Sequence, residues 1–216
     1  LRMSRGLGDV YKRQQYNWDG KEHRPKVVMD ENIAPEEYQV TYQGECKNVG
    51  KGIVIVQGKE NYKDSCILNY QIKLIQGKTY IHSGYKYKIT SKTTVRMMGA
   101  TNTRKTTILV PNVVNLGGTK LKVTEIGAAA FKKYKKLTSI KIGSNVTKIG
   151  AQAFAGDTKL KKCVFLNATI KTVGKNAWKG ISKNASFFVP KKGIKCYQKK
   201  LTKKTGFTKK MKIKRN

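Results

Sequence analysis

The second half of the sequence repeats itself with an almost constant period. The segment Val123 to Phe131 (VTEIGAAAF) recurs as Val146 to Phe154 (VTKIGAQAF). A third copy is visible at Val173-Gly174 and Ala177-Trp178, at a nearly equal interval from the second. A unit this short can bury an apolar face only against its neighbours, so a period in the low twenties is typical of a repeat architecture. The sequence therefore predicts similar coils stacked side by side.

Each copy contains a short run in which apolar residues alternate with others, as expected for a strand. The alternating apolar positions are Ile140 and Ile142, Cys163 and Phe165, and Phe187 and Val189. We expect these side chains to point into the core. Their neighbours should line the exposed side of a stacked parallel sheet, which makes them candidate binding residues. These candidates are Ser139, Lys141, Lys162, Val164, Ser186 and Phe188.

The spacing and the recurring Ile-Gly and Ala-Phe pairs closely resemble the BspA-like class of bacterial leucine-rich repeats. The resemblance implies a leucine-rich-repeat solenoid over residues 123–190. In this class a Gly-Cys pair often follows the Ala-Phe segment. Here Lys133-Tyr134 and Gly156-Asp157 stand at that point, so the cysteine is missing.

We expect the repeats to be flanked by two atypical segments. Residues 75–122 form a β-rich N-terminal part, because Tyr85 to Gly99 and Thr107 to Gly118 look like the strands that often precede such repeats. Residues 191–216 form a C-terminal helical cap followed by a final strand, because a stack of coils must cover its last apolar face. Gly206 supplies the stop signal of the helix. The apolar positions on one helix face are Ile194, Tyr197 and Leu201.

The first half has a period of two instead. Tyr38, Val40 and Tyr42 alternate with polar residues, and Ile53 to Val56 and Ile67 to Ile72 supply further β-branched runs. Four or five short strands separated by turn residues predict a small β-sandwich over residues 15–74. The whole chain is therefore expected to be mainly β.

This stretch resembles the bacterial immunoglobulin-like repeats of long secreted proteins, which act as spacers. This sequence differs from the family at Glu37, where the family usually has aspartate, and at Glu60, where the family usually has glycine. The matching segments are Tyr16, Asp19-Gly20-Lys21, Pro25-Lys26-Val27, Glu37 to Tyr42, Asn48 to Gly52, Gly58, Asn61-Tyr62 and Tyr70-Gln71-Ile72.

Residues 1–14 are set aside from the fold. Leu7 to Gln14 (LGDVYKRQ) looks like the peptide made when sequencing-adapter DNA is translated at the edge of a contig. The alternative is a disordered native linker. The chain starts at Leu1 instead of Met, and residues 1–25 contain no apolar signal-peptide core, so we expect the natural beginning to lie upstream. No apolar run is long enough to span a membrane.

Basic residues dominate the charge. Lys and Arg number 46 against 12 Asp and Glu, for a formal charge of +34. Residues 121–216 hold 26 of these bases, with Glu125 and Asp157 as their only acids. Such an excess attracts polyanions. A solvated face that keeps the protein soluble and a specific polyanion site both remain open. No specific nucleic-acid partner is expected, because lysine prevails over arginine and no docking module is visible.

The sequence offers little for catalysis or metal binding. Only His23 and His82 could act as acid–base groups near neutral pH, and neither lies near a nucleophile motif. No nucleotide-binding glycine motif is present. We therefore predict no enzymatic activity, no cofactor and no metal. The four cysteines lack metal-ligand spacing, and we expect no disulfide among them. They are Cys46, Cys66, Cys163 and Cys196.

These features lead to one hypothesis and two rivals. The leading hypothesis is a non-enzymatic secreted or cell-surface module for adhesion, whose lysine-rich sheet surface contacts an anionic partner. That partner would be a host matrix glycoprotein, or teichoic acid or another cell-wall polymer. The first rival is an accessory region of a larger secreted hydrolase whose catalytic domain lies upstream. The second is a plain stalk with no ligand.

Overall fold

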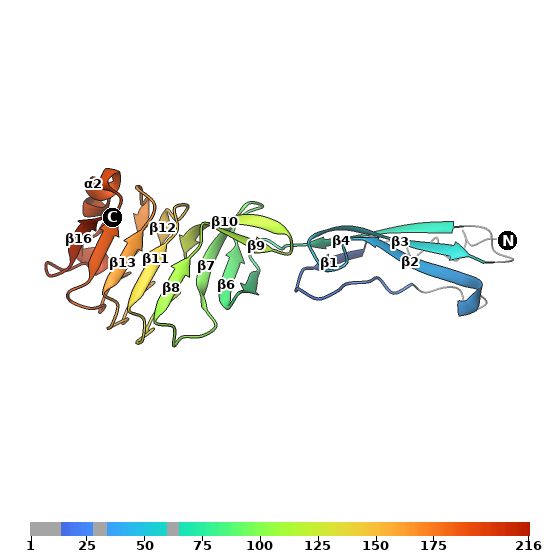
Figure 1. Cartoon of the computed structure of the whole chain (residues 1–216), viewed down its shortest axis with the longest axis horizontal. Helices are drawn as coiled ribbons and strands as arrows, with labels where there is room; N and C mark the ends of the chain where they lie inside the picture. Colours follow the sequence, from blue (N-terminus) through green and yellow to red (C-terminus); the bar gives the residue numbers. More distant parts are fainter. Residues whose placement is uncertain (1–13, 28–33, 60–64) are drawn as a thin grey trace. The chain divides into compact units, whose positions relative to one another are not determined.

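The structure is a computed structural model that describes residues 14–27, 34–59 and 65–216. Residues 1–13, Glu60 and the Asn61-Tyr62 pair, on which some of the predictions fall, lie outside these ranges. The described part holds sixteen strands and one α-helix of seven residues, so the prediction of a mainly β protein is confirmed (Figure 1). The chain divides into two compact units, residues 1–75 with 116–119, and residues 76–115 with 120–216.

The first unit is built on a four-stranded sheet with the order β1-β4-β3-β2. Strand β1 pairs parallel with β4, and β2, β3 and β4 form an antiparallel meander. The strands span Gln14–Asn17 (β1), Tyr38–Gly44 (β2), Gly50–Gly58 (β3) and Ser65–Lys73 (β4), with a 3-10 turn at Pro35–Glu37 before β2.

One face of this sheet carries the core of the unit. Val54, Val56, Tyr70 and Ile72 are buried there. The covering layer is the irregular segment 18–27, whose Trp18 and Val27 side chains pack against this core. The Tyr42 hydroxyl donates a hydrogen bond to the Pro25 carbonyl at 2.8 Å, which fastens the segment to the sheet. The predicted sandwich of two sheets is not confirmed, because among the described residues this segment takes the place of a second sheet.

The second unit contains two sheets. The first is seven-stranded, with the order β14-β12-β10-β7-β6-β5, and β9 pairs with β10. Its parallel part, β7-β10-β12-β14, continues from an antiparallel β5-β6-β7 meander. The bounds are Thr79–His82 (β5), Tyr85–Ile89 (β6), Thr94–Ala100 (β7), Val113–Leu116 (β9), Thr119–Ile126 (β10), Lys148–Ile149 (β12) and Thr172–Val173 (β14).

The other sheet is five-stranded and wholly parallel, with the order β16-β15-β13-β11-β8. Figure 1 shows β8, β11, β13 and β16 as arrows running in one direction. The strands span Thr107–Val110 (β8), Ser139–Ile142 (β11), Lys162–Phe165 (β13), Ser186–Val189 (β15) and Lys212–Arg215 (β16). The alternating apolar residues of β11, β13 and β15 are all buried, as the repeat alignment predicts.

Turn segments join the two sheets and are themselves bonded from coil to coil. The backbone N–H of Phe131 donates to the carbonyl of Ala153, and that of Phe154 donates to Ala177, at 2.8 and 2.9 Å. Inside this layer the rings of Phe131, Phe154 and Trp178 stack, with centroids 5.5 and 4.5 Å apart and interplanar angles of 11° and 5°. The repeating Phe and Trp positions thus form one continuous aromatic column.

Two backbone positions in each turn segment adopt the left-handed conformation. The first is held by Ala129, Gln152 and Asn176, with φ of 53°, 56° and 57°. The second is held by Lys133, Gly156 and Gly180, with φ of 64°, 83° and 75°. Glycine fills this second position in two coils, because it adopts positive φ without steric cost. Lys133 is the exception.

The last coil replaces a short strand by a helix. After β15 the chain forms a 3-10 turn at Lys191–Gly193, the helix α2 (Ile194–Lys200) and another 3-10 turn at Lys203–Thr205. Gly206 follows with a φ of 90°, and β16 then closes the sheet. The Tyr197 side chain from α2 is fully buried, and its hydroxyl donates to the Asn167 carbonyl at 2.9 Å.

Candidate binding surface on the five-stranded sheet

All six predicted binding residues lie on one face of the five-stranded sheet. They alternate along β11, β13 and β15 with the buried residues, so their side chains point away from the core. The parallel register aligns them across the strands in two rows. The adjoining strands extend both rows with residues that the repeat alignment did not include. These additional residues are Thr107 and Leu109 on β8, and Lys212 and Lys214 on β16.

The first row carries hydroxyl and ammonium groups and is called the hydroxyl row. Its five residues are register partners from β8 to β16. In strand order they are Thr107, Ser139, Lys162, Ser186 and Lys212. Lysine and serine therefore alternate over the last three strands, and the row presents donors with no carboxylate among them.

The second row lies two residues further along each strand and is called the apolar row. In strand order it consists of Leu109, Lys141, Val164, Phe188 and Lys214. The Leu109 side chain is 55% exposed. The ammonium groups of Lys162 and Lys214 lie 5.6 and 5.7 Å from the centre of the Phe188 ring. Both distances fall within the range of cation–π attraction, so the ring holds two cations close to itself.

The lysines of the two rows have no acidic neighbour in their own sheet. The five strands contain no Asp or Glu, and residues 121–216 have only two. Glu125 lies on β10 of the other sheet, where Arg96 and Lys148 contact its carboxylate at 2.6 and 3.1 Å. Although its burial acts in the opposite direction, hydrogen bonds from these two partners lower the pKa of Glu125. That carboxylate is therefore already paired.

Asp157, the second acid, is fully buried in the turn layer. Its Oδ1 accepts the backbone N–H of Tyr134 at 2.8 Å, whereas its Oδ2 has no hydrogen-bond partner among the described residues. Burial raises the pKa of the Asp157 carboxyl to about 8. The equivalent positions of the neighbouring coils hold Tyr134 and Ile181, so a carboxyl group here occupies a core site. Asp157 therefore contributes no charge to the surface.

The remaining chemically interesting residues do not assemble into a catalytic or metal site. His23 Nε2 lies 2.9 Å from Asp19 Oδ1 in the first unit, and the Cys46 thiol lies 3.3 Å from the Glu22 carboxylate. His82 ends β5 in the second unit. Within the described ranges no three His, Cys, Asp or Glu residues gather as metal ligands would. No disulfide joins cysteines within the described ranges, and burial raises the pKa of the Cys163 thiol.

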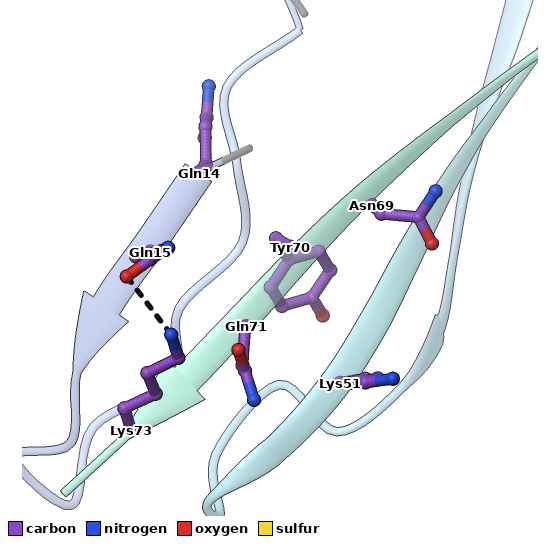
Figure 2. A pocket seen from close by; sticks show the side chains of 7 residues that line it. All are labelled: Gln14, Gln15, Lys51, Asn69, Tyr70, Gln71 and Lys73. Carbon is purple, nitrogen blue, oxygen red and sulfur yellow. Dashed lines mark hydrogen bonds between the residues drawn. The ribbon is translucent and has the colours of Figure 1, made fainter. Parts of the chain in front are cut away.

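A polar pocket of about 320 Å³ lies on the sheet of the first unit (Figure 2). Lys51, Gln71 and Gln15 are register partners across β3, β4 and β1, and Lys73 Nζ donates to Gln15 Oε1 at 3.2 Å. Gln14 belongs to the segment 1–14 that we set aside. The lining contains no carboxylate, imidazole or thiol, and none of the predicted binding residues. The lining residues are Gln14, Gln15, Lys51, Asn69, Tyr70, Gln71 and Lys73.

The stacked coils of the second unit resemble leucine-rich repeats. Residues 115–216 match a family model described as a BspA type leucine rich repeat region, in six copies. This match supports the predicted BspA-like repeats and counts more copies than the three that the repeat spacing revealed. None of the curated proteins matches this chain. No helix in the described part of the chain is long and apolar enough to cross a membrane.

Three solved structures resemble parts of the chain. A leucine rich cell surface protein from Faecalibacterium prausnitzii A2-165 has 19% identity and a TM-score of 0.47, covering 66% of this chain and 44% of its own. A leucine-rich repeat protein from Bacteroides ovatus has 26% identity and a TM-score of 0.40, and the match covers 52% of this chain and 35% of that protein. A leucine-rich repeat protein from Bacteroides capillosus has 21% identity and a TM-score of 0.37, and the match covers 51% of this chain and 71% of that protein. The chain thus spans less than half the length of the first two.

Proposed function

We propose that this chain is a non-enzymatic module of a secreted or cell-surface protein and that its five-stranded sheet binds an anionic partner. The observation that carries the proposal is the exposed sheet face, on which Lys141, Lys162, Lys212 and Lys214 stand in two rows on strands that contain no acid. Among the described residues none of these four lysines makes a salt bridge. Ammonium groups that no carboxylate neutralises within the described structure are available to an external anion.

The first unit would act as a spacer that displays the repeats. This role follows from the resemblance of residues 15–74 to immunoglobulin-like spacer modules. The same resemblance supports a location on the cell surface or outside the cell. The positive charge of the repeat half supports a role in adhesion. The anionic groups would belong either to a cell-wall polymer such as teichoic acid or to a host matrix glycoprotein.

Retention on immobilised partners at physiological salt tests the proposal, because salt screens diffuse attraction strongly. The chain should be retained by teichoic acid or by a matrix glycoprotein, and a Lys141→Ala/Lys162→Ala variant should elute earlier. A Lys179→Ala/Lys199→Ala variant has the same net charge and changes lysines outside the sheet, so it should elute with the unmodified protein. If the chain is not retained on any anionic support at physiological salt, the binding proposal fails and the stalk is favoured.

A further inference from the structure

We infer that the anionic partner is a linear acidic polysaccharide in which charged and uncharged sugars alternate. This inference rests on the proposed function, because it names the partner of the same surface. The feature behind it is the order of side chains in the hydroxyl row. Lys162, Ser186 and Lys212 succeed one another on adjacent strands, so an uncharged hydroxyl separates two ammonium groups.

The spacing of this pattern is set by the backbone. Adjacent strands of a sheet lie about 4.8 Å apart, so Lys162 on β13 and Lys212 on β16 are separated by about 10 Å at the backbone, with β15 between them. Two linked pyranose rings have a similar length. A chain that crosses the strands would therefore bring an acidic group to each lysine and an uncharged sugar to Ser186, whose hydroxyl both donates and accepts hydrogen bonds.

The apolar row provides the second contact that a sugar needs. Val164 and Phe188 are register partners of each other and stand one pleat repeat along the strands from Lys162 and Ser186. Pyranose rings expose C–H groups on their faces, which pack on apolar side chains, and sugar sites combine such contacts with a few placed polar groups. The row next to the cations is thus suited to the non-charged part of a glycan.

Phe188 also restrains the cations. The ammonium groups of Lys162 and Lys214 lie 5.6 and 5.7 Å from its ring centre, whereas an isolated exposed lysine samples many rotamers. Restraining a binding group before the ligand arrives lowers the entropy lost on binding. A polymer of phosphates needs none of these features, because it has neither apolar ring faces nor uncharged units to place against Ser186.

Titration calorimetry at physiological salt with three probes tests the inference. The probes are a ten-sugar hyaluronan oligosaccharide, in which acidic and neutral sugars alternate, a polygalacturonate oligosaccharide of equal length and inorganic polyphosphate. Hyaluronan should bind tightest. The Lys162→Ala/Lys212→Ala variant should bind hyaluronan about tenfold or more weakly than the unmodified protein. The Lys179→Ala/Lys199→Ala variant, which has the same net charge, should lose less than about twofold in affinity. Circular dichroism checks that both variants remain folded.

The Ser186→Ala variant distinguishes recognition of alternating charged and uncharged sugars from general electrostatic attraction. This substitution should weaken hyaluronan binding several-fold and leave polyphosphate binding unchanged, because only the glycan places a hydroxyl-bearing sugar against this side chain. Tighter binding of polyphosphate than of hyaluronan would overturn the inference and leave the proposed function intact. Equal losses in the two lysine variants would overturn both, because binding would then not depend on the sheet. If none of the three probes binds at physiological salt, and wall polymers and matrix glycoproteins are not retained either, the proposed function fails as well.

Discussion

Asp157 makes the stability of the repeat half depend on pH in an unusual direction. In the folded chain its carboxyl is buried, with one oxygen accepting the Tyr134 N–H and the other without a partner in the described structure. Replacing it by asparagine keeps an oxygen for that N–H and puts an uncharged amide where the second oxygen lies. The Asp157→Asn variant is therefore a close mimic of the protonated side chain.

The direction of the pH dependence follows from comparing the protonation of Asp157 in the folded and unfolded states. The pKa of the carboxyl rises from 3.8 to about 8 on folding. Between these values the folded protein keeps a proton that the unfolded chain has released, so the free energy of unfolding falls as the pH rises. The contribution is fully present below the lower pKa and lost above the upper one. Its slope is about 1.4 kcal/mol per pH unit, so the loss between about pH 5.5 and pH 8 reaches about 3 kcal/mol.

Urea unfolding of wild type and Asp157→Asn at both pH values measures this effect. Trp178 is fully buried in the repeat half, and the chain's other tryptophan is Trp18, so a Trp18→Phe background makes fluorescence report on the repeats. The carboxyls of Asp19, Glu22 and Glu125 have lowered pKa values and titrate below this range. We expect the variant to be more stable than the wild type at both pH values, and its advantage to grow by about 3 kcal/mol from the lower pH to the higher. Parallel pH profiles would refute the reasoning.

Four further changes test the packing of the coils. Phe154→Ala should lower the free energy of unfolding by about 3–5 kcal/mol, because the fully buried ring stacks between two others; a loss below about 1 kcal/mol in urea unfolding would contradict the aromatic column. Lys133→Gly should raise it by about 0.5–1 kcal/mol by relieving positive φ, and Gly156→Ala should lower it by a similar amount or more. Truncation at Pro190 should lower the thermal unfolding temperature, and an unchanged temperature would argue against a cap.

The repeat spacing was sufficient to predict the exposed sheet face. Strands with period two place every second residue on one side, and a constant repeat length keeps equivalent residues in register, so the six candidates could be found by alignment alone. The row residues on β8 and β16 were missed because their coils are longer than the repeat. The β9 strand is inserted between Thr107 and Ser139, and the helix α2 replaces a short strand between Ser186 and Lys212.

Two other features could not be inferred from local patterns. Alternation predicts a sheet with one buried face, but it does not specify what covers that face, and in the first unit the irregular segment 18–27 covers it. Asp157 follows a glycine and precedes a lysine-rich stretch, which is typical of a solvated turn. Only its alignment with Tyr134 and Ile181 reveals a core position. A polar residue in a repeated core site thus has to be recognised from the repeat and not from its own chemistry.

The hydrogen bonds that run from coil to coil also determine how the repeat half would respond to tension. Each coil is joined mainly to its two neighbours, so a force on the chain ends would load the terminal coil first and detach the coils in sequence. Each detachment would release one repeat, which is about 80 Å of extended chain. The repeat half would therefore lengthen in steps under tension and not in a single event.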